Sequence, residues 1–282
     1  MTASLDGIGA SVAAARSLLF VPGDRPDRFA KAAASGADLV VLDLEDAVAP
    51  ERKATAREFV RDWLAGGRAA LVRINAHGTP WYEDDLAMAQ DAGAPLMVPK
   101  AEDPERLAGH RTVQVPLIET ALGVLRAREL CAVPGVVRPA FGSIDLAAQL
   151  AVNPADREAL HHARATLVLA AAAASVAPPV DGVTTAVNDT EAARDDTVYA
   201  ARLGFSGKLC VHPGQVAVVH EALAPTPGEV RWAREVVEAA AGNTVAVLGG
   251  NMIDKPVVDR ARRLLVRAGD RSRTEPAAPT TP

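Results

Sequence analysis

The sequence predicts an α/β fold in which eight parallel strands close into a (β/α)₈ barrel surrounded by helices. Short runs rich in valine, leucine and isoleucine alternate with longer stretches of helical pattern. This alternation is typical of a parallel sheet, and eight repeats are the number that closes a barrel. A chain of 282 residues could also form two domains, and a doubly wound open sheet is the alternative arrangement of the same units.

Each predicted strand is followed by a helical segment. The apolar runs are SLLFV (17–21), DLVVLDLE (38–45), AALVRI (69–74), PLMVPK (95–100), TVQVPLIE (112–119), VVRPAFG (136–142), VDGVTT (180–185) and GKLCV (207–211). The helical patterns include RPDRFAKAAASG after the first run, ERKATAREFVRDWLAGG after the second and NDTEAARDDTVYAARLG after the seventh. Repetition of this unit from the first run to the eighth predicts the barrel.

Flanking segments are expected on both sides of the barrel, which we place at 16–224. We expect a flexible N-terminus at 1–15 and a helical extension at 225–269. The polar, proline-rich segment 270–282 has the composition of a disordered tail. The apolar spacing of the extension fits either a cap over one barrel end or a contact with a neighbouring subunit.

Composition excludes several classes of function. Hydrophobic residues make up 49% and charged residues 23%, as in an ordinary soluble protein with a large core, and aromatic residues only 4%. The net charge of −5, without a basic stripe interleaved with aromatics, argues against nucleic-acid binding. We find no signal peptide and no membrane span. Cys131 and Cys210 lack CxxC spacing, which predicts free thiols in a reducing cytoplasm.

Two acidic residues, Glu119 and Asp145, follow apolar runs that read as strands. The C-terminal ends of barrel strands meet at one face, so these carboxylates should lie close together. Two hard oxygen ligands favour Mg²⁺ or Mn²⁺. The alternative is ordinary acidic residues in the first turn of the following helices.

Further polar residues end other strands. Arg73 is the only guanidinium that ends a strand directly, and it suits a bidentate grip on a carboxylate or enolate. Its alternative role is a structural salt bridge to Glu45 or Asp46. Lys100 could form a Schiff base, although the nearby metal-ligand candidates make that role secondary. The sequence has no GxSxG elbow and no GxxxxGK[ST] phosphate loop.

The strand-end motifs, taken together, resemble a known family. In chain order they are RSLLFVPG, VVLDLEDAV, LVRIN, VPLIETALG, FGSIDLAAQL, GKLCVHPGQ and GGNMIDKP. They are similar to the citrate lyase beta subunit-like proteins, within the superfamily of malyl-CoA lyases and HpcH/HpaI-type aldolases. The resemblance covers roughly residues 16–268. It implies a TIM barrel, a divalent metal that is usually Mg²⁺, a homotrimer or hexamer, and carbon–carbon bond cleavage in 3-hydroxyacyl-CoA thioesters.

The resemblance also implies roles for individual residues. Glu119 and Asp145 would be the metal ligands, and Arg73 would contact the keto-acid carboxylate or the developing enolate. Glu45 and Asp46 would orient metal-bound waters. Arg16 and its neighbouring loop would hold the CoA phosphates. Asp254 resembles an acid/base residue that the C-terminal segment of a neighbouring subunit delivers.

Three functions remain open from the sequence. The first is a Mg²⁺-dependent lyase acting on citramalyl-CoA, malyl-CoA or a similar thioester. The second is an enzyme of the same barrel with other chemistry, such as a malyl-CoA thioesterase or a malate synthase-like enzyme. The third is a citrate lyase complex subunit acting on a citryl-acyl carrier protein. The presence of every predicted catalytic position in one chain favours an autonomous cytoplasmic enzyme, with a homotrimer as the expected assembly.

Overall fold

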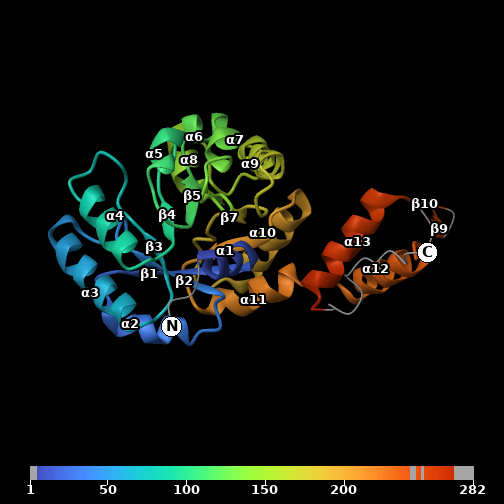
Figure 1. Cartoon of the computed structure of the whole chain (residues 1–282), viewed down its shortest axis with the longest axis horizontal. Coiled ribbons are helices and arrows are strands. Elements are labelled where there is room, and N and C mark those ends of the chain that lie inside the picture. The colour runs from blue at the N-terminus through green and yellow to red at the C-terminus, as the bar shows by residue number, and fades with distance from the viewer. Residues whose placement is uncertain (1–4, 242–245, 249–250, 270–282) are drawn as a thin grey trace, which may run out of the picture. The chain divides into compact units, whose positions relative to one another are not determined.

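The predicted closed barrel is confirmed. In the computed structural model, which describes residues 5–241, 246–248 and 251–269, eight parallel strands follow one another in chain order and β8 pairs with β1 (Figure 1). The chain divides into two compact units, residues 1–223 and 224–282. The first contains the whole barrel.

The eight barrel strands are short and lie within or next to the predicted apolar runs. They are β1 (Ser17–Pro22), β2 (Leu39–Asp43), β3 (Leu71–Arg73), β4 (Leu96–Val98), β5 (Gln114–Ile118), β6 (Ala140–Phe141), β7 (Val180–Asp181) and β8 (Gly207–Cys210). The helices of the same unit are α1 (Leu5–Ala14), α2 (Pro26–Ala33), the 3₁₀ helix η1 (Pro50–Arg52), α3 (Lys53–Ala65), α4 (Tyr82–Asp91), α5 (Pro104–Ala108), α6 (Ala121–Leu125), α7 (Ala127–Cys131), α8 (Ser143–Leu150), α9 (His161–Ala173), α10 (Thr190–Leu203) and α11 (Gly214–Leu223).

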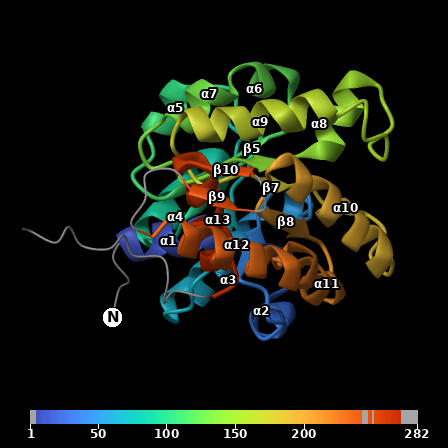
Figure 2. The same cartoon turned by 90° about the vertical axis from the view of Figure 1, so that its right-hand side faces the viewer.

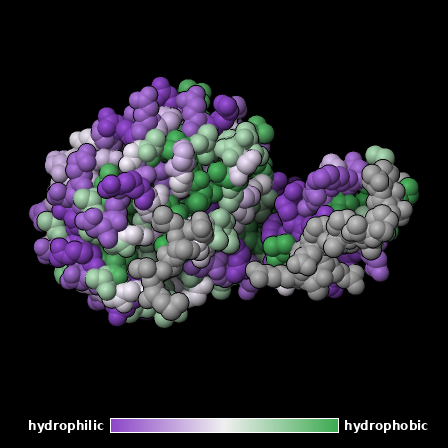
Figure 3. Space-filling model, viewed as in Figure 1, coloured by the Kyte–Doolittle hydropathy of each residue, from purple (hydrophilic) through white to green (hydrophobic). Residues whose placement is uncertain are grey.

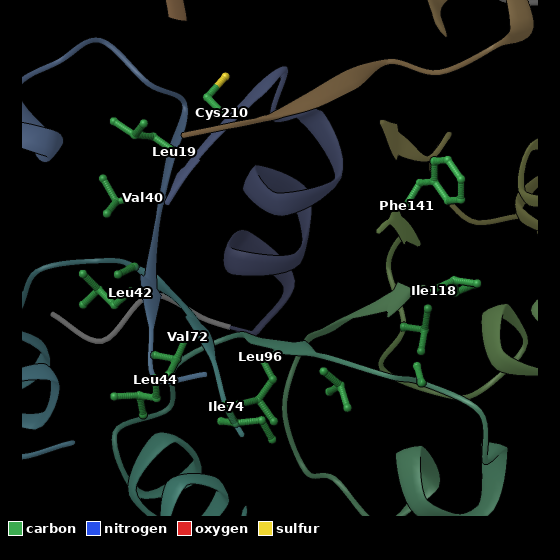
Figure 4. Close-up of a cluster of buried hydrophobic side chains, with 14 of the residues drawn as sticks. Leu19, Val40, Leu42, Leu44, Val72, Ile74, Leu96, Ile118, Phe141 and Cys210 are labelled. Carbon is green, nitrogen blue, oxygen red and sulfur yellow. The ribbon is translucent and has the colours of Figure 1, made fainter. Parts of the chain in front are cut away.

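Alternation along the strands divides the core into two layers. The inner layer fills the barrel with residues such as Leu18, Val41 and Leu71. Their sequence neighbours Leu19, Leu42 and Val72 belong to the outer layer, between strands and helices (Figure 4). Successive side chains of a strand point to opposite faces, so a near-continuous apolar run can supply both layers. The same alternation puts Asp43, Arg73 and Glu119 on the inner side, where the strands end.

Helix α1 closes the N-terminal end of the barrel. Val12 and Ala15 pack into the inner layer. The guanidinium of Arg138, which is fully buried, donates hydrogen bonds to the carbonyl oxygens of Val12, Ala13 and Ala15 at 3.3, 3.2 and 2.7 Å. The expectation of a flexible N-terminus is therefore wrong for residues 5–14, because an apolar helix with capped carbonyls packs against the strands. Residues 1–4 lie outside the described part.

The outer helices bury one face each against the strands. In α3, Ala56, Val60 and Trp63 are buried at the spacing of one helical face. Helix α9 packs along α7, and α10 packs along α11 (Figure 2). Hydrophilic side chains predominate on the surface over α3 and α4 (Figure 3). Among the described helices, none is both long and apolar enough to cross a membrane.

The second unit is a helical hairpin with its own core. Helices α12 (Pro227–Ala239) and α13 (Lys255–Arg267) pack together, and β9 (Ala246–Leu248) pairs antiparallel with β10 (Asn251–Ile253). Buried residues of both helices, including Val236 and Leu265, form a separate apolar cluster. Thr226 and Glu229 form a capping box that starts α12. The contact of this extension with a neighbouring subunit remains a prediction, and the tail at 270–282 lies outside the described residues.

Candidate functional site

The C-terminal ends of the strands bring together a group of acidic side chains. Asp43 ends β2 and is followed by Glu45 and Asp46, Glu119 follows β5, and Asp145 lies in the first turn of α8. Asp43, Glu45 and Glu119 are buried, with 1%, 5% and 2% of their surfaces exposed, whereas Asp145 is exposed. Burial of several carboxylates requires cations, because a buried unpaired charge is strongly destabilising.

Arg73 is the first of these cations. Its Nε and Nη2 each lie 2.6 Å from an oxygen of Asp43, and its Nη1 lies 3.0 Å from Glu45 Oε2 and 3.5 Å from Asp46 Oδ2. Burial alone would lower the pKa of Arg73, but its bonds to Asp43 and the charge of Glu45 raise the pKa overall. The structural salt bridge and the substrate-binding role are therefore compatible, since exposed Asp46 can yield its place at Nη1 to a ligand.

Lys100 links two of the carboxylates. Its Nζ donates to Glu45 Oε1 at 2.7 Å and its backbone N–H donates to Glu119 Oε1 at 2.8 Å. Burial alone would lower the pKa of Lys100, but Glu45 outweighs it and raises the pKa. An ammonium held in this way is a poor nucleophile, which disfavours a Schiff base. The backbone of Lys100 is left-handed, with φ 48°, a strained conformation of the kind that clusters at functional sites.

Glu119 is the acid of this group whose pKa is shifted most clearly. Burial and the negative charges of Glu45 and Asp145 raise the pKa of Glu119 to about 8. The chain after β6 passes directly over this side chain, since a Cβ added at Gly142 would clash with Glu119. Glu119 is therefore pressed against the start of α8, the helix that carries Asp145. Sequence reasoning expected this pair to converge, and a shared metal site formed by Glu119 and Asp145 stays a prediction.

The charges of this group fit a divalent cation. Five carboxylates (Asp43, Glu45, Asp46, Glu119 and Asp145) face Arg73, Lys100 and the buried Lys53, which donates to the carbonyl oxygens of Leu44 and Glu45. With Glu119 ionised, as a bound cation would require, these side chains have a formal excess of two negative charges. Mg²⁺ sites commonly use one or two protein carboxylates and complete their coordination with water or substrate. Among the described residues, no group of three or more His, Cys, Asp or Glu side chains is arranged to hold a metal ion.

Two cavities lie beside the acidic group. One, of about 480 Å³, is lined by Lys100 and Thr120 among others. The other, of about 330 Å³, is lined by Ser143 and Ile144, the residues just before Asp145. Both have volumes in the range of small-molecule sites. The linings of these two cavities therefore reach the sequence neighbours of Glu119 and Asp145, and contain none of the five carboxylates themselves.

Two predicted site residues are not part of this group. Arg16 precedes β1 and so lies at the N-terminal end of the barrel, where its Nε contacts Asp38 Oδ2 at 3.3 Å. The length of β1 separates Arg16 from the carboxylates, so the structure does not bring it to this group, and its role toward the CoA phosphates stays a prediction. Arg25, in the loop after β1, is on the same side as the carboxylates. Asp254 belongs to the second unit, where it caps the N-terminus of α13.

Sequence reasoning gave no role to Asp43, although Asp43 holds Arg73. The signal was available in the barrel register, because Asp43 of β2 lies directly beside Arg73 of β3. A buried acid and a buried arginine at paired positions of neighbouring strands are placed to form a bidentate bond. Cys131 and Cys210 are both free and buried, as predicted.

Comparison with known proteins agrees with the motifs at the strand ends. The family model described as HpcH/HpaI aldolase/citrate lyase matches residues 16–114 and 105–213. The chain belongs to this family. It is 39% identical over 274 residues to the citrate lyase subunit beta-like protein of Deinococcus radiodurans, covering 89% of this chain and 96% of that protein.

Some relatives of this chain are named for a different activity. The chain is 34% identical over 270 residues to a (3S)-malyl-CoA thioesterase of Cereibacter sphaeroides, covering 90% of this chain and 94% of the relative. Its structure is similar to the crystal structure of protein CitE from Mycobacterium tuberculosis in complex with magnesium, acetoacetate and coenzyme A, with a TM-score of 0.80 and 38% identity. That match covers 91% of this chain and 99% of the other.

Proposed function

We propose that this protein is a Mg²⁺-dependent carbon–carbon lyase that cleaves a 3-hydroxyacyl-CoA thioester into an acyl-CoA and a keto acid. Citramalyl-CoA and malyl-CoA are the expected substrates. The observation that carries the proposal is the position of Glu119, which is buried at the end of β5 and lies against Gly142 at the start of α8, the helix whose first turn carries Asp145. A related CitE structure that contains magnesium and coenzyme A supports the choice of metal and substrate class.

In this proposal Glu119 and Asp145 hold the metal. A bound Mg²⁺ would supply Lewis acidity to the 3-hydroxyl and the adjacent carboxylate of the substrate. Glu45 and Asp46 would accept hydrogen bonds from metal-bound waters. Lys100 would keep Glu45 ionised through their 2.7 Å contact.

Arg73 is assigned to the substrate. Its Nη1, which touches only Glu45 and the exposed Asp46, would bind the carboxylate of the keto acid or the enolate oxygen. A carboxylate base, which we assign below to Asp254, would take the 3-hydroxyl proton. The ketone forms as the carbon–carbon bond breaks, and the bonding electrons remain on the thioester enolate. A positive charge next to that enolate lowers the barrier. Asp43 would keep the guanidinium in place throughout.

The enolate needs a proton to become the acyl-CoA product. We assign this step to Asp254 as well, delivered by a neighbouring subunit of a homotrimer. Having accepted the 3-hydroxyl proton as a carboxylate, Asp254 would return that proton to the enolate carbon, as in general acid–base catalysis. In the second unit Asp254 Oδ1 accepts a long hydrogen bond, 3.4 Å from the backbone N–H of Val257. That weak cap leaves the carboxyl group available for proton transfer.

The test is to measure keto acid, acyl-CoA and free CoA released from citramalyl-CoA and malyl-CoA, with Mg²⁺ and with excess EDTA. Metal-dependent release of pyruvate or glyoxylate together with acetyl-CoA is the expected result. Free CoA and a hydroxy acid without keto acid would identify a thioesterase instead. That second candidate is favoured by the similarity to the Cereibacter sphaeroides protein.

A further inference from the structure

A second charged cavity lies at the ends of strands β6–β8. This cavity, of about 330 Å³, is lined by three cationic side chains, Arg157, Arg164 and Lys208, and by the aromatic Tyr199. The proposed lyase mechanism uses none of these residues. Its rim includes Ser143 and Ile144, so it adjoins the turn of α8 that carries Asp145.

The cations are fixed by two aspartates. Arg164 Nε lies 2.8 Å from Asp181 Oδ1, and Lys208 Nζ lies 3.5 Å from the other oxygen of Asp181 and donates to the carbonyl of Gly182 at 2.7 Å. Separately, Arg157 Nη2 lies 3.1 Å from Asp196 Oδ1. The cavity lining contains no other charged side chain, so its formal charge is +1. Such a cavity favours an anionic occupant.

Arg164 has N–H groups that are available to a ligand. Within the described part of the chain, its only hydrogen bond is the one from Nε, although the side chain is 9% exposed and is stacked near the rings of Phe141 and Tyr199 at 5.0 and 5.7 Å. Packing of the guanidinium plane fixes the direction of its two Nη groups. A planar fork held in this way matches the oxygen pair of a carboxylate or phosphoryl group.

We propose that this cavity is an oxyanion subsite, in which Arg164 and Arg157 bind an anionic group of the substrate remote from the metal. The proposal extends the proposed function, because it adds a binding determinant beside the Glu119–Asp145 pair. Two parts of a CoA-thioester substrate carry such a group. One is a second carboxylate on the acid portion, and the other is a phosphoryl group of CoA.

The experiment measures ligand affinity by calorimetry in the presence of Mg²⁺, with two pairs of ligands. Malate and lactate differ by one carboxylate and test the first source. CoA and pantetheine differ by the phosphorylated nucleotide and test the second. The variants are Arg157→Gln and Arg164→Gln, and Arg128→Gln, at an exposed position of α7, is the matched control for loss of one charge. Arg164→Gln leaves Lys208 as a partner for Asp181, which favours retention of the fold.

We expect both pocket variants to bind the more charged ligand of one pair, malate or CoA, about tenfold more weakly. That is the usual effect of losing a charge-assisted hydrogen bond. Binding of the less charged member and all binding by Arg128→Gln should stay unchanged. An equal loss of affinity for both ligands of each pair, or no loss of affinity in either pair, would refute the proposed subsite. Turnover of malyl-CoA by the unmodified protein tests the lyase proposal separately, since an inactive protein with this ligand preference would refute only the lyase.

Discussion

The two ends of the barrel each bury an arginine, but they surround it with different acceptors. At the N-terminal end, Arg138 donates only to neutral oxygens, including the carbonyls of Ala15 and Pro178 at 2.7 and 2.9 Å. Burial lowers the pKa of Arg138 to about 10. At the C-terminal end, Arg73 is held by carboxylates and its pKa is raised.

This difference separates a structural arginine from one suited to binding. The carbonyl oxygens around Arg138 belong to the C-terminal end of α1, to Ala15 just after it, and to Pro178 and Pro179 just before β7, so they are part of the closed N-terminal end of the barrel. Asp46, beside Arg73, is exposed and lies 3.5 Å away, so a substrate carboxylate can replace it at little cost. Arg138 therefore serves stability at the N-terminal end, whereas Arg73 at the C-terminal end has an acidic neighbour that a ligand can replace.

The largest expected effect tests the charged end. Glu119→Gln and Asp145→Asn should each reduce Mg²⁺-dependent turnover by at least about a thousandfold, because each removes a proposed ligand of the Lewis acid. The melting temperature of the metal-free protein should change little at neutral pH, since Glu119, with its pKa raised to about 8, is already mostly uncharged there. Calorimetry with Mg²⁺ and thermal melting would check both effects. Retained Mg²⁺-dependent activity in both variants would refute the assignment.

Arg73→Lys should reduce kcat/KM by roughly a hundredfold, because a lysine keeps the charge but loses the bidentate geometry. Steady-state kinetics would measure this effect, and circular dichroism would verify the fold. Arg52→Lys is a suitable control, since Arg52 forms an exposed pair with Asp24 at 2.8 Å. Equal losses in the two variants would mean that Arg73 contributes no special geometry.

The substitution Arg138→Leu tests the N-terminal end of the barrel. It leaves buried carbonyl oxygens of α1 and Pro178 without their donor, so the free energy of unfolding should fall by on the order of 3 kcal/mol. Urea denaturation would measure that loss, while kcat per folded molecule should stay unchanged. A loss of kcat with normal stability would show that the two ends are not functionally separate.

The pH dependence of Mg²⁺ affinity tests the proton on Glu119. With its pKa raised to about 8, the carboxyl group is mostly protonated at neutral pH in the metal-free protein, and Mg²⁺ must displace that proton. Affinity should therefore rise by up to about tenfold per pH unit below 8 and level off above it. Calorimetry in buffers of different ionisation enthalpy would also detect proton release. Affinity independent of pH between 6 and 8 would contradict the shift.

The smallest expected signal comes from mixed oligomers. An Asp254→Ala chain and an Arg73→Ala chain should each be inactive, and the mixture should recover up to roughly a quarter of normal activity by random assembly. Recovery requires that Arg73 and Asp254 of one site come from different chains. No recovery, after labelled subunits are seen to exchange, would place both residues of a site in one chain.

The sequence was sufficient for the barrel, because eight apolar runs each followed by a helical pattern leave few other arrangements. It was also sufficient to place Glu45, Arg73 and Glu119 at one face, since all three end strands. It did not place Arg16 at that face, because the Arg16 motif is adjacent to the barrel strand but at its beginning. It also missed Arg164, because a helix residue that pairs with Asp181 seventeen positions later leaves no local pattern. Residues 5–14 were misjudged because their helix is stabilised by packing rather than by its own sequence.

Gly142 limits how this protein can be redesigned. Any side chain at that position would collide with Glu119, so a library that randomises the loop after β6 would lose nearly every member at position 142. Ala155, Ala186 and Ala192, which line the cavity of Arg164, are small residues that can vary without touching the carboxylates. A search for new substrate preference should therefore hold the glycine constant and diversify these alanines.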